Sequence, residues 1–88
     1  MSRYEEAIQE FRRALDSEPA SGMASYNLGV ALEAKGLRED ALLAWETFLH
    51  RVGPNADGAG FDVKMREGVA RLKPLIVKAH TVSGISPR

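Results

Sequence analysis

The chain of 88 residues contains no cysteine and only two histidines, His50 and His80. Without cysteine it can form neither a disulfide nor a thiolate metal site, and two histidines alone cannot complete the four ligands of a tetrahedral zinc site. We therefore expect a protein with no bound metal and no other cofactor.

Excess charge of one sign is also missing. Twelve Lys and Arg balance twelve Asp and Glu, so the chain as a whole does not favour a nucleic-acid partner. The signs are nevertheless separated: residues 1–59 hold six basic and ten acidic side chains, a formal charge of −4, and residues 60–88 hold six and two, or +4. We interpret this as acidic first turns of helices and a basic outer face of the last helix. Attraction between copies, or a basic tail that docks on an acidic surface, are the alternatives.

Long apolar runs and catalytic motifs are missing as well. No run reaches the ~18 apolar residues of a membrane span, and the early glutamates Glu5, Glu6 and Glu10 do not fit the start of a signal peptide. The chain has no nucleophile elbow, no glycine-rich phosphate loop after a strand, and no recognisable carboxylate pair in an apolar cleft. We expect a cytoplasmic protein that is not an enzyme and has no membrane partner.

What the chain does contain is a near repetition of itself. Five pairs of similar residues are each separated by 34 positions: Glu5 and Glu39, Ala7 and Ala41, Ile8 and Leu42, Phe11 and Trp45, Leu15 and Leu49. A fixed period of this size indicates a helical solenoid, in which each unit leaves an apolar face for its neighbour to cover.

Capping signals divide the chain into helices. Ser2 with Glu5 forms a capping box, Ser21 can cap a second helix, and Gly36 suits the left-handed residue that closes one. Apolar residues at helical spacing support two further helices, the first of which should close at Gly53-Pro54. The expected helices cover residues 2–17, 22–35, 38–51 and 61–72.

Pro74 should stop or kink the last of these helices. We therefore expect a helical domain over residues 1–73 and a loose tail over 74–88, with one further helical turn after the proline as an open alternative. Within the helix of residues 61–72, Glu67 and Arg71 stand four positions apart and are expected to pair.

Small and bulky residues recur in the order of a known repeat. The positions that carry the pattern are Ala7, Phe11 and Pro19, then Tyr26, Asn27, Leu28, Gly29 and Gly36, then Ala41, Trp45 and Pro54. The pattern resembles the tetratricopeptide repeat, a helix-turn-helix unit of about 34 residues. The resemblance covers residues 2–54 and implies an all-α fold of antiparallel helix hairpins: one and a half repeats followed by a C-terminal capping helix.

The chain departs from the repeat at four positions. Leu32 stands where the repeat often has Tyr, and Pro54 arrives one residue late. Ser25 stands where the repeat usually has Trp, and Phe48 stands where a small residue is common. We expect the bulky Phe48 to need unusual room, which suggests that the helix packed beside it is a terminal helix.

The resemblance implies a noncatalytic module that binds a partner peptide or segment on its concave face. The candidate contact residues on that face are Tyr26, Asn27, Val30 and Glu33. Asn27 is the strongest candidate because its amide can donate to and accept from an extended backbone. The same face of this helix has no Lys or Arg, so a clamp for a terminal carboxylate is not expected, and an apolar or weakly basic segment is the expected partner. Met23 and Ala34 are instead expected to pack on the last helix.

Two other roles remain open. In the family, a preceding helix would cover the edge of the first helix, which carries Tyr4, Ala7, Phe11 and Ala14. These residues could instead form a self-association edge between two copies, giving a homodimer, or the chain could be the C-terminal end of a longer repeat protein.

Overall fold

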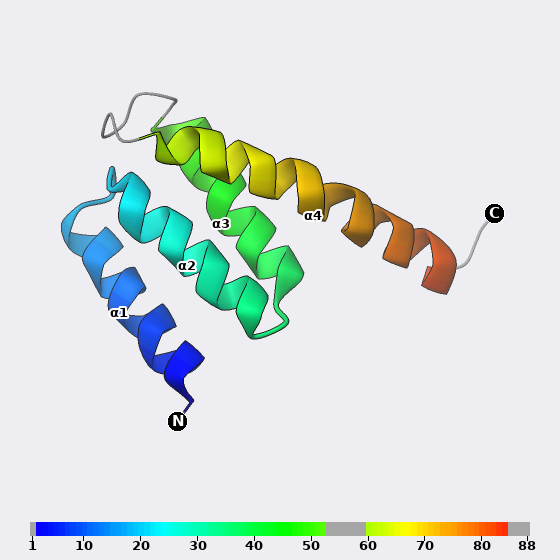
Figure 1. The fold of residues 1–88 in the computed structure, drawn as a ribbon, viewed down its shortest axis with the longest axis horizontal. Coiled ribbons are helices and arrows are strands. Elements are labelled where there is room, and N and C mark those ends of the chain that lie inside the picture. Colours follow the sequence, from blue (N-terminus) through cyan, green and yellow to red (C-terminus); the bar gives the residue numbers. More distant parts are fainter. Residues whose placement is uncertain (1, 53–59, 85–88) are drawn as a thin grey trace.

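In the computed structural model, which describes residues 2–52 and 60–84 with side chains as far as Lys78, the chain forms four α-helices (Figure 1). They are α1 (Arg3–Ser17), α2 (Gly22–Ala34), α3 (Arg38–Arg51) and α4 (Phe61–Gly84). Each helix packs against the next one along the chain, and α2 also contacts α4. The described residues contain no strand, so the predicted all-α solenoid fold is confirmed.

Side-chain caps determine where the first two helices begin. The Ser2 hydroxyl accepts a hydrogen bond from the Glu5 amide at 3.1 Å, and the Glu5 carboxylate accepts one from the Ser2 amide at 3.3 Å. The Ser21 hydroxyl accepts from the Ala24 amide at 3.1 Å. The capping box and the second cap, both predicted, satisfy amides that have no partner within the helix.

The turn between α2 and α3 depends on Gly36. Its φ of +93° lies in the left-handed region, which a residue with a side chain rarely adopts. The Leu37 amide donates back to the Leu32 carbonyl at 2.9 Å, and the Gly36 amide donates to the Glu33 carbonyl at 2.9 Å. This closure ends α2 one residue before the predicted boundary.

Trp45 of α3 lies at the centre of the core with 1% of its surface exposed. Its indole ring lies between the backbones of α2 and α4: a Cβ at Gly29 would lie 2.7 Å from Cζ2, and a Cβ at Gly68 would lie 2.7 Å from Cε3. The ring nitrogen Nε1 donates to the Tyr26 carbonyl at 3.2 Å. Two glycines on adjacent helices therefore provide the space that the largest side chain of the core occupies.

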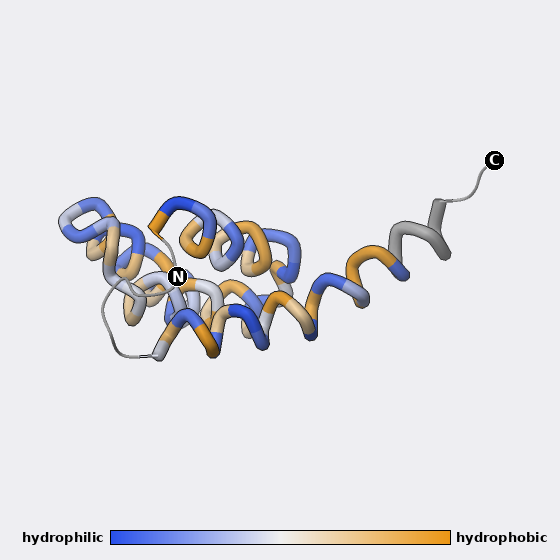
Figure 2. The backbone as a smooth tube through the Cα atoms, turned by 90° about the horizontal axis from the view of Figure 1, so that it is seen from above, coloured by the Kyte–Doolittle hydropathy of each residue, from blue (hydrophilic) through white to orange (hydrophobic). Residues whose placement is uncertain are grey.

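The fourth helix does not end at residue 72 as predicted. It continues through Pro74 to Gly84 and extends well past the other three helices (Figure 2). Because proline has no N–H, the Ala70 carbonyl has no donor within the helix. Ala70 and Pro74 are both exposed, so water can donate to this carbonyl instead. Ile76 continues the apolar stripe and packs against the core. The stretch expected to be a loose tail is therefore helical as far as residue 84.

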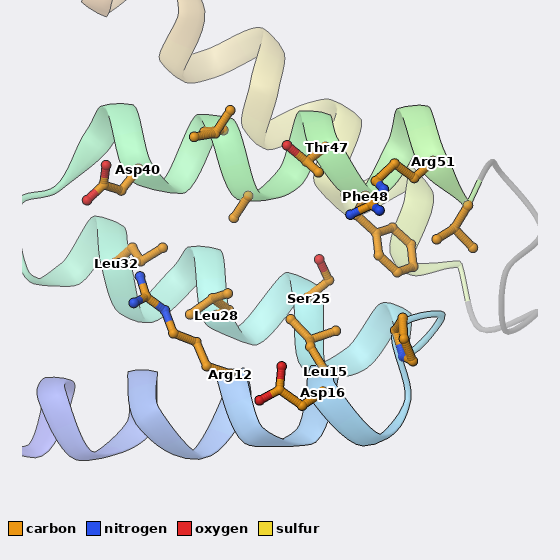
Figure 3. A pocket seen from close by; sticks show the side chains of 14 residues that line it. Arg12, Leu15, Asp16, Ser25, Leu28, Leu32, Asp40, Thr47, Phe48 and Arg51 are labelled. Carbon is orange, nitrogen blue, oxygen red and sulfur yellow. The ribbon is translucent and has the colours of Figure 1, made fainter.

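Phe48 lines a cleft together with residues of α2. Phe48 is 5% exposed, Ser25 of α2 is 2% exposed, and both line one cleft between α1 and α3 (Figure 3). A large residue on α3 is thus matched by a small one on α2, and these two departures from the repeat compensate each other. The predicted closure of α3 at Gly53-Pro54 lies outside the described residues.

Candidate functional site

The predicted contact residues lie on the side of α2 that faces away from its buried stripe. The buried stripe, predicted to be core, is confirmed: Ala24, Leu28, Ala31 and Leu32 are each at most 8% exposed. Helical spacing places the four predicted contact residues together on the other side. We call this surface the inner wall and define it by Tyr26, Asn27, Val30 and Glu33.

Tyr26 is held on three sides. Its half-buried ring stacks on Trp45 with centroids 5.9 Å apart and contacts the Phe61 ring of α4 at 5.8 Å. Its carbonyl accepts the Trp45 hydrogen bond. Lys64 of α4 places Nζ 5.7 Å from the centre of the Tyr26 ring and 5.3 Å from that of Phe61. Tyr26 therefore forms an edge of the inner wall that core contacts hold in place.

Glu33 forms an ion pair across the helix interface. Both of its carboxylate oxygens accept hydrogen bonds from the guanidinium of Arg71 on α4, one of them at 3.1 Å. The hydrogen bonds with Glu33 raise the pKa of Arg71. The prediction that Arg71 pairs with Glu67 on its own helix is therefore wrong, because α4 lies close enough to α2 for the longer-range pair to form.

This pair changes the charge of the inner wall. The sequence places only the acidic Glu33 on this face of α2, which is why an apolar or weakly basic partner was expected. In the structure α4 brings Lys64 and Arg71 to the same edge, and Arg71 offsets the charge of Glu33. The wall is consequently not an acidic surface. The expectation of a weakly basic partner, which depended on an acidic wall, is therefore no longer supported.

The middle of the inner wall remains open. Val30 is 42% exposed. Asn27 is half-buried, and among the described residues its side-chain amide has no hydrogen-bond partner. Met23 is 56% exposed and Ala34 is also exposed, so the expectation that α4 covers them is wrong. The wall thus offers apolar surface beside an available amide.

The four residues of the predicted self-association edge are divided by the structure. Tyr4 is 49% exposed and Ala14 is also exposed. Ala7 and Phe11 are half-buried and pack against the hydrophobic core. Two of the four residues of the predicted edge therefore pack within the same chain, which leaves Tyr4 and Ala14 accessible to another copy.

A cleft lies on the opposite side of α2, between α1 and α3 (Figure 3). This outer cleft has a volume of about 740 Å³ and an apolar floor that includes Leu28, Leu32 and Phe48, with Arg12 and Arg51 at its margins. Sequence reasoning did not identify it. The signal was present in Ser25, since a small residue where the repeat usually has Trp leaves space, of which Phe48 fills a part.

The described residues contain neither a metal-ligand cluster nor a membrane-spanning helix. No group of three or more His, Asp or Glu side chains in the described part could hold a metal ion. None of the helices described is apolar enough over sufficient length to cross a bilayer.

Comparison with known proteins identifies one similarity. The family model described as Tetratricopeptide repeat matches residues 1–57, which is more than half of the chain and includes α1, α2 and α3. No match was found among curated proteins or among solved structures.

Proposed function

Because this chain belongs to the tetratricopeptide repeat family, whose members generally mediate protein–protein interactions, we propose that it binds a segment of another protein on the inner wall of α2. The proposed contacts are Tyr26, Asn27, Val30 and Glu33. The role is noncatalytic: the wall positions a partner and carries out no chemistry on it.

The observation that carries the proposal is the 42% exposure of Val30 on the inner wall. An apolar side chain held open beside the Asn27 amide suits a segment that places one apolar residue on Val30 and pairs its backbone with the amide. The rims need no rearrangement, because Tyr26 is stacked and Glu33 is ion-paired already. A preorganised site loses less conformational entropy on binding, which favours affinity.

The outer cleft is a second candidate surface for the same function. Its volume of about 740 Å³ and its apolar floor are the observations in its favour. Leu43 beside it is 64% exposed and would contact a segment lying there. We favour the inner wall because it combines apolar surface with an available amide and fixed rims.

Self-association through α1 has less support. Of the four residues expected at that edge, only Tyr4 and Ala14 are exposed. A homodimer through this edge would have to be built around one tyrosine ring.

The experiment that tests the proposal compares two amide deletions. Asn27→Ala removes the amide of the inner wall, and Gln9→Ala removes an exposed amide of α1 as a matched control. Both variants should keep the circular dichroism and melting temperature of the parent. We expect Asn27→Ala alone to weaken partner capture from the native source, and equal capture by the two variants would refute this placement.

A further inference from the structure

Three basic side chains form a row along α4, and two of them, Lys64 and Arg71, reach the inner wall. Lys64, Arg71 and Lys78 are separated by seven residues each, or two helical turns, and therefore lie along one side of the helix about 10 Å apart. The rotation of α4 is fixed by Met65 and Leu72, both fully buried. The row is consequently a stable feature of the surface.

Contacts with α2 show which way the row faces. Lys64 reaches the Tyr26 ring, with Nζ 5.7 Å from the centroid, and Arg71 reaches Glu33. Both partners belong to the inner wall. The side of α4 that bears the row is therefore the side next to Val30 and Asn27.

The charge of this row is only partly offset. Among the described residues Lys64 and Lys78 form no ion pair, and Arg71 is paired with Glu33. The aromatic rings near Lys64 attract its ammonium group without cancelling its charge. Glu67 stands three positions after Lys64 and four before Arg71, on the same side of α4, and it offsets part of the charge of the row. Lys64 is thus the basic side chain at the border of the inner wall for which the described residues provide no ion pair.

We infer that the segment bound on the inner wall is acidic, with a carboxylate side chain at Lys64 next to the apolar residue that covers Val30. This inference rests on the proposed function and adds the chemistry of the partner. Lys64 is already drawn toward the wall by two rings, so less side-chain freedom is lost when a carboxylate joins it. Arg71 has five donors and can bind a second carboxylate while it keeps Glu33.

The test uses three capped peptides of equal length that differ only in charge. One alternates Glu with Leu and Ser, the second replaces every Glu by Gln, and the third replaces every Glu by Lys. Acetylated and amidated ends ensure that any carboxylate comes from a side chain. Binding is followed by fluorescence anisotropy of the labelled peptide and by amide chemical shifts of the isotope-labelled domain.

We expect the acidic peptide to bind most tightly and to shift the resonances of Asn27, Val30 and Lys64. Lys64→Glu should weaken this binding by about five- to tenfold. The substitution removes a partly exposed ion pair with the peptide and replaces it by repulsion between two carboxylates. Arg66→Glu changes the net charge equally on the same helix, away from the row, and should weaken it less than twofold.

Three results would overturn the inference: no binding of the acidic peptide, equal binding of the Gln or Lys peptide, or equal losses in Lys64→Glu and Arg66→Glu. If the Gln peptide binds equally and depends on Asn27, the acidic preference fails while the proposed function stands. If the acidic peptide shifts Leu43 and Phe48 and leaves Val30 unmoved, the placement on the inner wall fails as well.

Discussion

A single methyl group added at Gly68 should destabilise the domain. At an exposed helix position Gly→Ala stabilises, because alanine has about 1 kcal/mol better helix propensity. Gly68, however, faces the Trp45 ring: the new Cβ would lie 2.7 Å from Cε3 and 2.9 Å from Cη2. These separations are far below van der Waals contact, so either the ring or α4 must move.

Neither of them can move freely. Gly29 lies against another part of the same indole, and the Nε1 hydrogen bond to the Tyr26 carbonyl at 3.2 Å holds the ring in place. A shift of α4 would open the packing of Met65 and Leu72, both fully buried. Overpacking costs about 1–3 kcal/mol, and a confined ring places this site in the upper half of that range. After the gain in propensity we expect Gly68→Ala to lower the free energy of unfolding by about 1–2 kcal/mol.

Urea unfolding followed by circular dichroism measures this change, and the melting temperature should fall by about 4–8 °C per kcal/mol. Ala70→Gly, at an exposed position of the same helix, reports the propensity contribution alone. In a Trp45→Phe background, where the benzo ring is gone, Gly68→Ala should become neutral or stabilising. If Gly68→Ala stabilises the parent domain, the account of a ring confined between two glycines is refuted.

Three further predictions concern the ends and edges of the fold. Pro74→Ala should raise both helicity and the free energy of unfolding, by at most about 3 kcal/mol, because α4 runs through this position; no change would mean that the helix ends before it. The hydrogen bond from Lys35 is the main cause that lowers the pKa of Glu5 below 4.5, so this contribution to stability is present above pH 4.5 and is lost as the pH falls through the lowered pKa. Carboxyl titration by NMR should show the pKa of Glu5 rising toward 4.5 in Lys35→Met, and an unmoved value would contradict the pairing. Phe11→Asp should unfold the domain and Tyr4→Asp should not, as judged by circular dichroism; a folded Phe11→Asp would show that Phe11 is not part of the core.

The helix boundaries that local chemistry determines were predictable from the sequence. The α1 and α2 caps at Ser2 and Ser21 involve residues three positions apart, and the turn at Gly36 requires one backbone conformation. Patterns of this kind can be recognised within a few consecutive residues of the sequence. For this reason α1, α2 and α3 agree with prediction to within one residue at each end.

Features that depend on two distant segments were not predictable in the same way. Arg71 was assigned to a partner on its own helix, whereas Glu33 lies 38 positions away and is brought near by the packing of α4. Pro74 was predicted to stop or kink the last helix. The helix continues because Ile76, beyond the proline, packs against the core. Ser25 and Phe48 were each recognised as unusual, but their compensation appears only when α2 and α3 are side by side.

The inner wall itself is partly predictable. Its four residues follow from the repeat and from helical spacing, which also separates them from the buried stripe. The basic border does not follow, since Lys64 and Arg71 belong to a helix outside the matched residues 1–57. The partner chemistry deduced from α2 alone therefore differs from that deduced once α4 is in place.

Site-specific photo-crosslinking tests the central claim most directly. A benzophenone amino acid is placed at Val30 on the inner wall or at Leu43 beside the outer cleft, two exposed positions on neighbouring helices. In extract of the native source, position 30 should crosslink to a protein partner, position 43 should not, and Asn27→Ala should abolish the crosslink. A crosslink that forms at position 43 and not at position 30 would contradict the claim that the inner wall binds the partner.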